Sequence, residues 1–343
     1  MSLAQKTFQA VKSIVEKGMC IKNERQLIIY DRQSKLSSLL ADAYKEHMPK
    51  ADFIDFDTTE KSVIQEKLES LESGDTVILV QSTNFRLDNF RIRLNLFNRG
   101  IGCLEHAHLA YIYEHEYETY VDAVAFRGDY YKDLGLYLKE KLDLDSEVKI
   151  ESYDGSLLTF GAMEDSKLNT GLFAEQKSRG GAAMCGEVFS EAQDFSTVNG
   201  EMSIFCYPGD DLRIIQCEPF KVQVKESFIS SHDPKCPKDF RENILDRIEK
   251  DEKRGGVFMR ELGFGLNPAI TKEKTVADVN AFERMAGVHV SLGMKHQIYR
   301  NKFKKEVIQR YHIDIFVDTK RVFIDDELIF ENGKYLFDSL KIR

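Results

Sequence analysis

The pattern of apolar residues changes near residue 145, and this change predicts a chain folded in two different parts. Before that point, short apolar segments alternate with segments whose apolar residues recur at helical spacing. The predicted elements are helix 3–17, strand 26–31, helix 35–47, strand 51–56, helix 60–71, strand 73–82, helix 86–98, strand 101–108 and helix 129–142. Strands that alternate with helices at this spacing are typical of βαβ units on a parallel sheet.

After the change, the chain reads mostly as β-structure. Segments with alternating apolar and polar residues cover 148–155, 156–162, 201–209 and 212–228, and turns rich in Gly, Asp and Pro separate them. Helical spacing returns only at 238–251 and 276–285. We therefore expect an α/β domain with a parallel sheet over residues 1–145. Residues 146–343 are expected to form a mixed α+β, mostly β, domain.

Composition limits the kinds of partner that the protein can have. The 343 residues carry a formal net charge of -9 and no long basic segment, which argues against binding to nucleic acid or to an anionic membrane. No apolar run approaches the roughly 20 residues of a membrane span, and the N-terminus has no signal-peptide core. We expect a cytoplasmic protein with reduced cysteines.

The segment Tyr311–Asp318 contains a possible metal site. Its sequence, YHIDIFVD, alternates apolar and polar residues and predicts a strand. A period of two places His312 and Asp314 on the same face of that strand. An imidazole and a carboxylate side by side suit Zn²⁺, Fe²⁺, Mn²⁺ or Co²⁺. His289 lies in a second short β-like segment, GVHVSLG, and Glu283 lies just before it.

Two further carboxylates occur in sequences that are unusual for surface glutamates. Glu187 follows a segment rich in Gly and Ala (RGGAAMCGEVFS), and Glu261 is followed by two glycines and a proline (RELGFGLNP). Small residues at such positions let backbone or a ligand approach closely. Taken singly, each glutamate could also cap a turn or form a local ion pair.

The order GEVF, ELGFGLNP, a Glu before GVHVSLG, and HID resembles the thermophilic-type aminopeptidase family of metallopeptidases. The resemblance implies a hydrolase that removes unblocked N-terminal residues with two divalent cations, Zn, Co or Mn, and that forms a homodimer. It implies six metal ligands, which are Glu187, Glu261, Glu283, His289, His312 and Asp314. It also implies catalytic roles for Glu187 and Glu261, while His296 stands where the family has a catalytic tyrosine and is a candidate for proton transfer.

The departures from the family pattern leave a second activity open. Glu283 lies one residue further from His289 than in the peptidases, and the segment before His312 lacks the expected glycines. The sequence is also similar to the ring-cleaving 2,5-dihydroxypyridine dioxygenases of the same superfamily. That resemblance implies one Fe(II), held by His289, His312 and Asp314 as a two-histidine, one-carboxylate triad. A metal-binding relative without catalytic activity is a third reading.

The first domain contains two weaker candidate sites. Glu105, His106 and His108 form a Glu-His-Ala-His sequence at the end of a predicted strand, with His115 following. This spacing can hold a metal, and packing at the edge of the sheet is the alternative. Ser82 follows VILVQ, the part of segment 73–82 with the clearest strand pattern in the first half of the chain. No GxSxG or GxGxxG motif accompanies it, which argues against a nucleophile or a nucleotide site.

Overall fold

The computed structural model describes residues 1–22, 24–87, 91–252, 255–295 and 310–337. These residues form two compact units. The first comprises 1–132, 169–186 and 272–278, and the second comprises 133–168, 187–271 and the described part of 279–343. Within the described residues, no helix combines the length and apolar character needed to cross a membrane.

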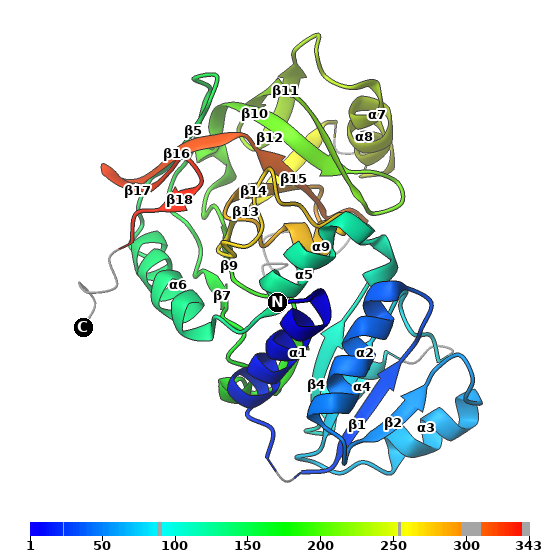
Figure 1. Ribbon diagram of the computed structural model, residues 1–343. Helices are drawn as coiled ribbons and strands as arrows, with labels where there is room; N and C mark the ends of the chain where they lie inside the picture. The colour runs from blue at the N-terminus through cyan, green and yellow to red at the C-terminus, as the bar shows by residue number, and fades with distance from the viewer. Residues whose placement is uncertain (23, 88–90, 253–254, 296–309, 338–343) are drawn as a thin grey trace. The chain divides into compact units, whose positions relative to one another are not determined.

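The first unit is an α/β fold around a parallel sheet (Figure 1). Its strands follow the order β2-β1-β3-β4-β8, and all of the pairs are parallel. The elements are α1 (Leu3–Ser13), a π-helical turn (Ile14–Met19), β1 (Gln26–Tyr30), α2 (Lys35–His47), β2 (Asp52–Asp55), α3 (Lys61–Glu69), β3 (Thr76–Val80), α4 (Ile92–Asn98), β4 (Gly102–His106), α5 (Tyr117–Val124) and β8 (Gly180–Ala182). The parallel sheet predicted from the alternating pattern is confirmed.

Helices cover both faces of this sheet. On one face, odd-numbered strand residues such as Leu27 and Val77 form one apolar cluster with Ile64 of α3 and Leu96 of α4. Even-numbered residues such as Ile28 point to the other face, where α1 and α2 lie (Figure 1). Strands buried on both faces explain the near-continuous apolar segments of the sequence.

Helix α4 begins later than the predicted helix 86–98. Phe85 and Leu87 are buried in the apolar cluster that also contains Ile92 and Leu96. Arg91 has an extended backbone, with φ −87° and ψ 94°, and the helix starts only at Ile92. Phe85 and Leu87 therefore contribute to the core from outside the helix.

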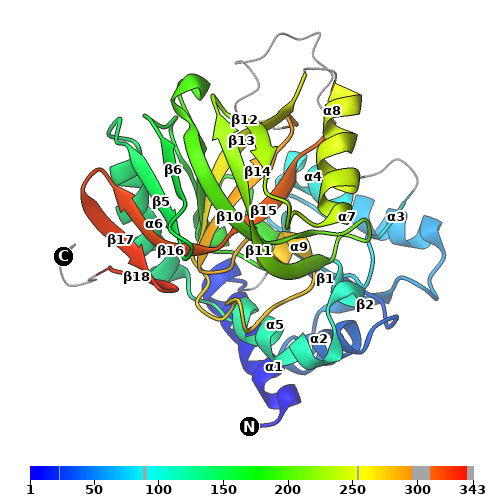
Figure 2. The same ribbon diagram turned by 90° about the horizontal axis from the view of Figure 1, so that it is seen from above.

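The second unit is mostly β-structure, as predicted, and its strands pair antiparallel. It contains most of α6 (Gly128–Leu142), β5 (Val148–Ser152), β6 (Leu157–Phe160), β7 (Lys167–Asn169), β9 (Glu187–Glu191), β10 (Asn199–Pro208), β11 (Ile214–Lys225), β12 (Phe228–His232), α7 (Lys238–Phe240), α8 (Asp246–Glu252), β13 (Val257–Gly265), α9 (Val279–Phe282), β14 (Gly287–Leu292), β15 (Ile313–Val317), β16 (Thr319–Ile324), β17 (Glu327–Glu331) and β18 (Lys334–Tyr335). Pairing runs in the order β11-β12-β13-β14-β15-β10, and β10 also pairs with β11, so six strands form a closed ring (Figure 2). Strand β9 pairs with β13 outside that ring.

The two helices predicted in this half have different outcomes. The segment 238–252 is helical, with a π-helical turn at Arg241–Leu245 between α7 and α8. The predicted helix 276–285 is wrong except for the single turn α9. Residues 272–278 belong to the first unit, where Glu116 accepts hydrogen bonds from the hydroxyl of Thr275 (2.7 Å) and the backbone N–H of Ala277 (2.9 Å). These contacts hold the segment outside any helix.

Candidate metal centre

Four neighbouring strands, β9, β13, β14 and β15, carry most of the predicted ligands. In the antiparallel register, Glu261 lies opposite Ser291, and Ser291 lies opposite Asp314. Residues directly opposite each other share a face of the sheet. Two residues after Glu261 on β13, Gly263 lies opposite His289 of β14. Two residues further on the same strand, Gly265 lies opposite Glu187 of β9. The period of two therefore directs these side chains to one face.

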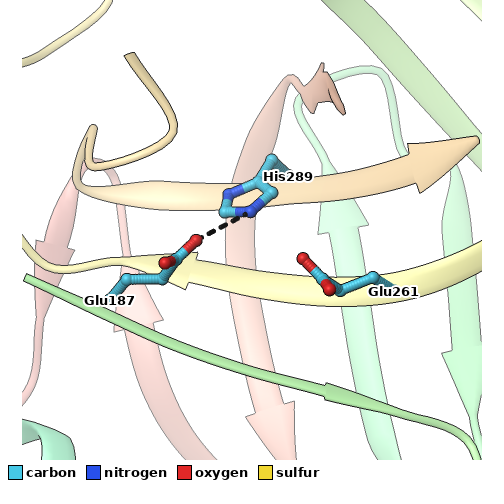
Figure 3. A group of neighbouring side chains, drawn as sticks. All are labelled: Glu187, Glu261 and His289. Carbon is cyan, nitrogen blue, oxygen red and sulfur yellow. Dashed lines mark ion pairs between the residues drawn. The ribbon is translucent and has the colours of Figure 1, made fainter. Parts of the chain in front are cut away.

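Five of the six predicted ligands form two donor groups. Glu187, Glu261 and His289 form the first group, and Glu261, His312 and Asp314 form the second. In each group, one ligand atom from each residue lies within 4.8 Å of the others. Figure 3 shows the side chains of the first group pointing toward one another from adjacent strands. Glu261 belongs to both groups and is thus the shared carboxylate of the cluster.

The donor atoms fit divalent cations in spacing and in chemistry. Nε2 of His289 lies 3.3 Å from Oε1 of Glu187, and Nε2 of His312 lies 3.5 Å from Oδ1 of Asp314. Ligands bonded at about 2.1 Å to one cation lie roughly 3.0–3.4 Å apart. Nε2 of His289 is buried and accepts no hydrogen bond from the described residues. A buried ring nitrogen beside carboxylates is a donor set that Zn²⁺, Mn²⁺ or Co²⁺ accepts.

Two glycines of β13 leave space for the His289 side chain and for the backbone at Met285. A Cβ atom on Gly263 would lie 2.1 Å from Nε2 of His289, so the imidazole crosses β13 only because this residue has no side chain. A Cβ on Gly265 would lie 2.0 Å from the carbonyl oxygen of Met285. Close approach of His289 and of Met285 thus explains the two glycines after Glu261.

Glu283, the sixth predicted ligand, lies beside the cluster in contact with Arg284. Nη1 of Arg284 lies 2.5 Å from Oε2 of Glu283 and 3.0 Å from Oε2 of Glu187. Glu283 is a member of neither donor group formed by the described residues. Arg284 directly follows a predicted ligand, but nothing in the sequence around it indicates this contact.

Burial and mutual repulsion make the four carboxyl groups differ in acidity. Burial, together with the charges of Asp314 and Glu187, raises the pKa of Glu261 to about 7. Burial and the charge of Asp314 also raise the pKa of Glu283 well above its usual range. Burial acts to raise the pKa of Glu187 as well, but the charges of Arg284 and His289 outweigh it, and this pKa is lowered.

Asp314 is held in its charged form by its neighbours. Burial again acts to raise its pKa, but the charges of His312 and His289 and the hydrogen bonds of Glu283 and Ser291 outweigh that effect and lower it. The Ser291 hydroxyl donates a hydrogen bond to Oδ1 of Asp314. Such bonds orient metal-binding carboxylates. Ser291 was not predicted, although it lies two residues after His289 on the same strand.

A buried ion pair lies next to the cluster. Nε of Arg260 donates to Oε1 of Glu191 at 2.5 Å, and both side chains are almost completely buried. Glu191 lies opposite Glu261 in the register of β9 and β13. The pair therefore links the two strands that carry Glu187 and Glu261. Nothing in the sequence around either residue signals it.

The remaining candidates lie elsewhere or outside the described residues. His296, the proposed proton-transfer residue, is outside them. His106 is buried between the hydroxyls of Tyr44 (2.7 Å) and Tyr120 (3.0 Å), and burial lowers its pKa to about 3. Nδ1 of His108 lies 3.1 Å from Oδ1 of Asp278.

Among the described residues, neither weaker candidate of the first unit belongs to a possible metal-binding group. Both donor groups found among the described residues lie in the second unit. The Glu-His-Ala-His sequence of the first unit therefore belongs to neither of these two groups. The Ser82 hydroxyl donates to the buried carboxylate of Asp31 at 2.5 Å. The serine thus takes part in a closed hydrogen-bond network at the start of α2, without a histidine partner in its described contacts.

Comparison with known proteins gives a fold and no family. No family model matches the chain, and no curated protein sequence matches it. Among solved structures, 2,5-dihydroxypyridine dioxygenase from Pseudomonas putida KT2440 is similar, with a TM-score of 0.60, 14% identity, and coverage of 97% of this chain and 96% of that one. AmpT from Thermus thermophilus, an aminopeptidase T, also gives a TM-score of 0.60, with 10% identity and coverage of 98% and 100%. The chain therefore has the fold shared by proteins from both families that its motifs resemble.

Proposed function

We propose that the protein is a metal-dependent hydrolase of aminopeptidase type that works with two divalent cations, Zn, Co or Mn. The observation that supports this most strongly is the pair of donor groups that share Glu261. A carboxylate between two cations, with an imidazole on each side, is an arrangement suited to a two-metal site. The similar fold of the aminopeptidase T from Thermus thermophilus adds support.

The residues of the cluster have separate tasks in this proposal. When bound, two cations would supply Lewis acidity toward a peptide carbonyl and toward water. Glu187, Glu261 and Asp314 would supply the negative charge needed to hold two cations close together, and Glu261 belongs to both donor groups. His289 and His312 are neutral ligands that set the geometry. Ser291 fixes the orientation of Asp314 through its hydrogen bond.

The alternative is a ring-cleaving dioxygenase with one Fe(II). The similar fold of the dioxygenase from Pseudomonas putida supports this alternative. That activity requires His289, His312 and Asp314 to converge on one metal. Among the described residues, His289 belongs to one donor group and the other two residues belong to the second. This division favours the hydrolase.

A substrate panel tests the proposal. Protein freed of metal and then reconstituted with Zn²⁺, Co²⁺ or Mn²⁺ is incubated with unblocked di- and tripeptides and with the same peptides N-acetylated. We expect release of the N-terminal residue, detected by mass spectrometry, from unblocked peptides only. A Glu261→Gln variant is expected to lose this activity. Oxygen uptake with Fe(II) and 2,5-dihydroxypyridine, without peptide cleavage, would overturn the proposal, and no turnover of either kind would favour the non-catalytic reading.

Homodimer formation and a cytoplasmic location remain predictions from the sequence and its resemblance. Light scattering coupled to size-exclusion chromatography measures the first directly. A mass near twice 39.5 kDa is the expected result.

A further inference from the structure

Arg284 places a permanent positive charge against the metal cluster. Its guanidinium contacts the carboxylates of both Glu283 (2.5 Å) and Glu187 (3.0 Å), and its side chain is only 12% exposed. An arginine remains charged at any pH at which the protein is folded. The cluster therefore contains a fixed cation before any metal binds.

The backbone holds this arginine firmly in place. The carbonyl of Arg284 accepts a hydrogen bond from the backbone N–H of Asn267 at 2.8 Å. The carbonyl carbon of Arg284 also packs against Gly265, at 2.7 Å from the position that a Cβ would occupy there. Both contacts come from the segment that directly follows Glu261. The position of the guanidinium is thus part of the same framework as the ligands.

The charge of Arg284 acts unequally on the two donor groups. Each group has two carboxylates and one imidazole, and they share Glu261. Glu187, which contacts Arg284, belongs only to the first group, while Asp314 of the second group accepts a hydrogen bond from the uncharged hydroxyl of Ser291 and lies beside Glu283. A cation entering the first group meets a carboxylate that is already partly neutralised.

We propose that Arg284 makes the two metal sites unequal, so that the group Glu261–His312–Asp314 binds its cation first and the group Glu187–Glu261–His289 binds second and weakly. This inference rests on the proposed two-metal function and adds an order of loading to it. Arg284 also contacts Glu283, which belongs to neither donor group of the described residues. The weak site is therefore filled only when the metal is abundant, and activity that requires both cations follows the metal concentration.

Repulsion between two cations weakens the second site of any such pair, so a difference in affinity alone does not identify Arg284 as its cause. The test therefore compares variants by titration of metal-free protein with Mn²⁺, using calorimetry and electron paramagnetic resonance of bound Mn²⁺. The wild-type protein is expected to show a tight and a weak site. His312→Ala should remove the tight one, and His289→Ala the weak one.

Arg284→Gln is the decisive variant. We expect the affinity of the weak site to rise at least tenfold, within the usual range of coupling between sites, while the tight site changes less than about threefold. Arg284→Lys keeps the charge and should keep the difference. Arg321→Gln removes an ion pair with Glu151 on other strands of the same unit and serves as the control. If circular dichroism shows that Arg284→Gln is unfolded, Arg284→Met gives the same readout.

The possible outcomes separate this inference from the proposed function. If each of the two sites binds Mn²⁺ with the same affinity in Arg284→Gln as in the wild type, the role of Arg284 is overturned. The two-metal function is then left intact. An unequal pair in which Arg284→Gln strengthens the tight site would reverse the proposed order and overturn it. A complete absence of Mn²⁺ binding in the folded wild type would overturn both.

Discussion

Gly263 shows that the metal cluster depends on residues that have no chemistry of their own. The imidazole of His289 occupies the space where the Cβ of any other residue would be. We predict that Gly263→Ala displaces the imidazole and weakens metal binding at the first donor group at least tenfold. Overpacking of this kind also costs about 1–3 kcal/mol of folding free energy.

Calorimetric titration with Mn²⁺ and thermal unfolding measure the two effects. Gly209→Ala is the matched control, because Gly209 has an ordinary φ and the nearest atoms to an added Cβ are 3.2 Å away. Unchanged Mn²⁺ affinity in Gly263→Ala would contradict the assignment of His289 as a ligand.

Protons compete with metal ions at Glu261. Because its pKa is raised to about 7, the metal-free carboxyl is partly protonated near neutral pH, and a cation must displace that proton. We predict that Mn²⁺ affinity rises as the pH increases from 6 to 8, by at most about tenfold per pH unit for each proton displaced. Calorimetry in buffers with different ionisation enthalpies counts the protons released. Binding that is independent of pH over this range would contradict the prediction.

The residues of the cluster differ in how far the sequence could reveal them. Alternation within a strand predicts that His312 and Asp314 share a face, and the same rule applied to GVHVSLG would have found Ser291. Arg284 could not be found in this way, because its partner Glu187 is 97 positions away in the chain (284 − 187) and only the pairing of strands brings them together. Charged residues beside ligands are common, and local sequence does not show which of them point inward.

At the scale of elements, the buried ion pair between Arg260 and Glu191 ties β13 to β9. Removing one partner of a buried pair leaves an uncompensated charge, which costs about 3–5 kcal/mol. We predict that Arg260→Met destabilises the protein by about that amount. The double variant Arg260→Met/Glu191→Leu should recover at least half of the loss. Urea unfolding measures both, and a single variant as stable as the wild type would show that the pair does not stabilise the sheet.

The predicted elements were most accurate where burial and local periodicity agree. Strands β1, β3 and β4 are buried on both faces and lie within the predicted segments. Helix α4 starts only at Ile92, and the upstream residues Phe85 and Leu87 join the core without being helical. The single turn α9 stands where a ten-residue helix was predicted, because Glu116 binds the segment before it. Both errors arise from contacts that are distant in sequence.

At the scale of the whole molecule, the chain returns to its first unit twice. Residues 169–186 add β8 to the parallel sheet, and residues 272–278 bind to the segment around Glu116. The change of pattern near residue 145 gave the two kinds of architecture. The change of pattern does not predict that residues 169–186 and 272–278 belong to the first unit. Short segments with few apolar residues have no periodicity that assigns them to a unit.

The contact between His108 and Asp278 helps to hold residues 272–278 in the first unit. It also makes the stability of this segment depend on pH. The hydrogen bond and charge of Asp278 raise the pKa of His108 above its ordinary value near 6.5. The stabilisation is therefore fully present below about pH 6.5 and is lost as the pH rises through the raised pKa. We predict that Asp278→Asn lowers the thermal midpoint more at pH 6 than at pH 9. His232→Gln, at an exposed histidine, is the control, and an equal loss at both pH values would contradict the prediction.

Anomalous X-ray diffraction from crystals grown with excess Mn²⁺ tests the central claim most directly. We predict two anomalous peaks, one among Glu187, Glu261 and His289 and the other among Glu261, His312 and Asp314. With limiting Mn²⁺, only the second peak should remain. A single peak shared by His289, His312 and Asp314 would contradict the two-metal account and favour the dioxygenase. No peak at this cluster would contradict the assignment of a metal centre there.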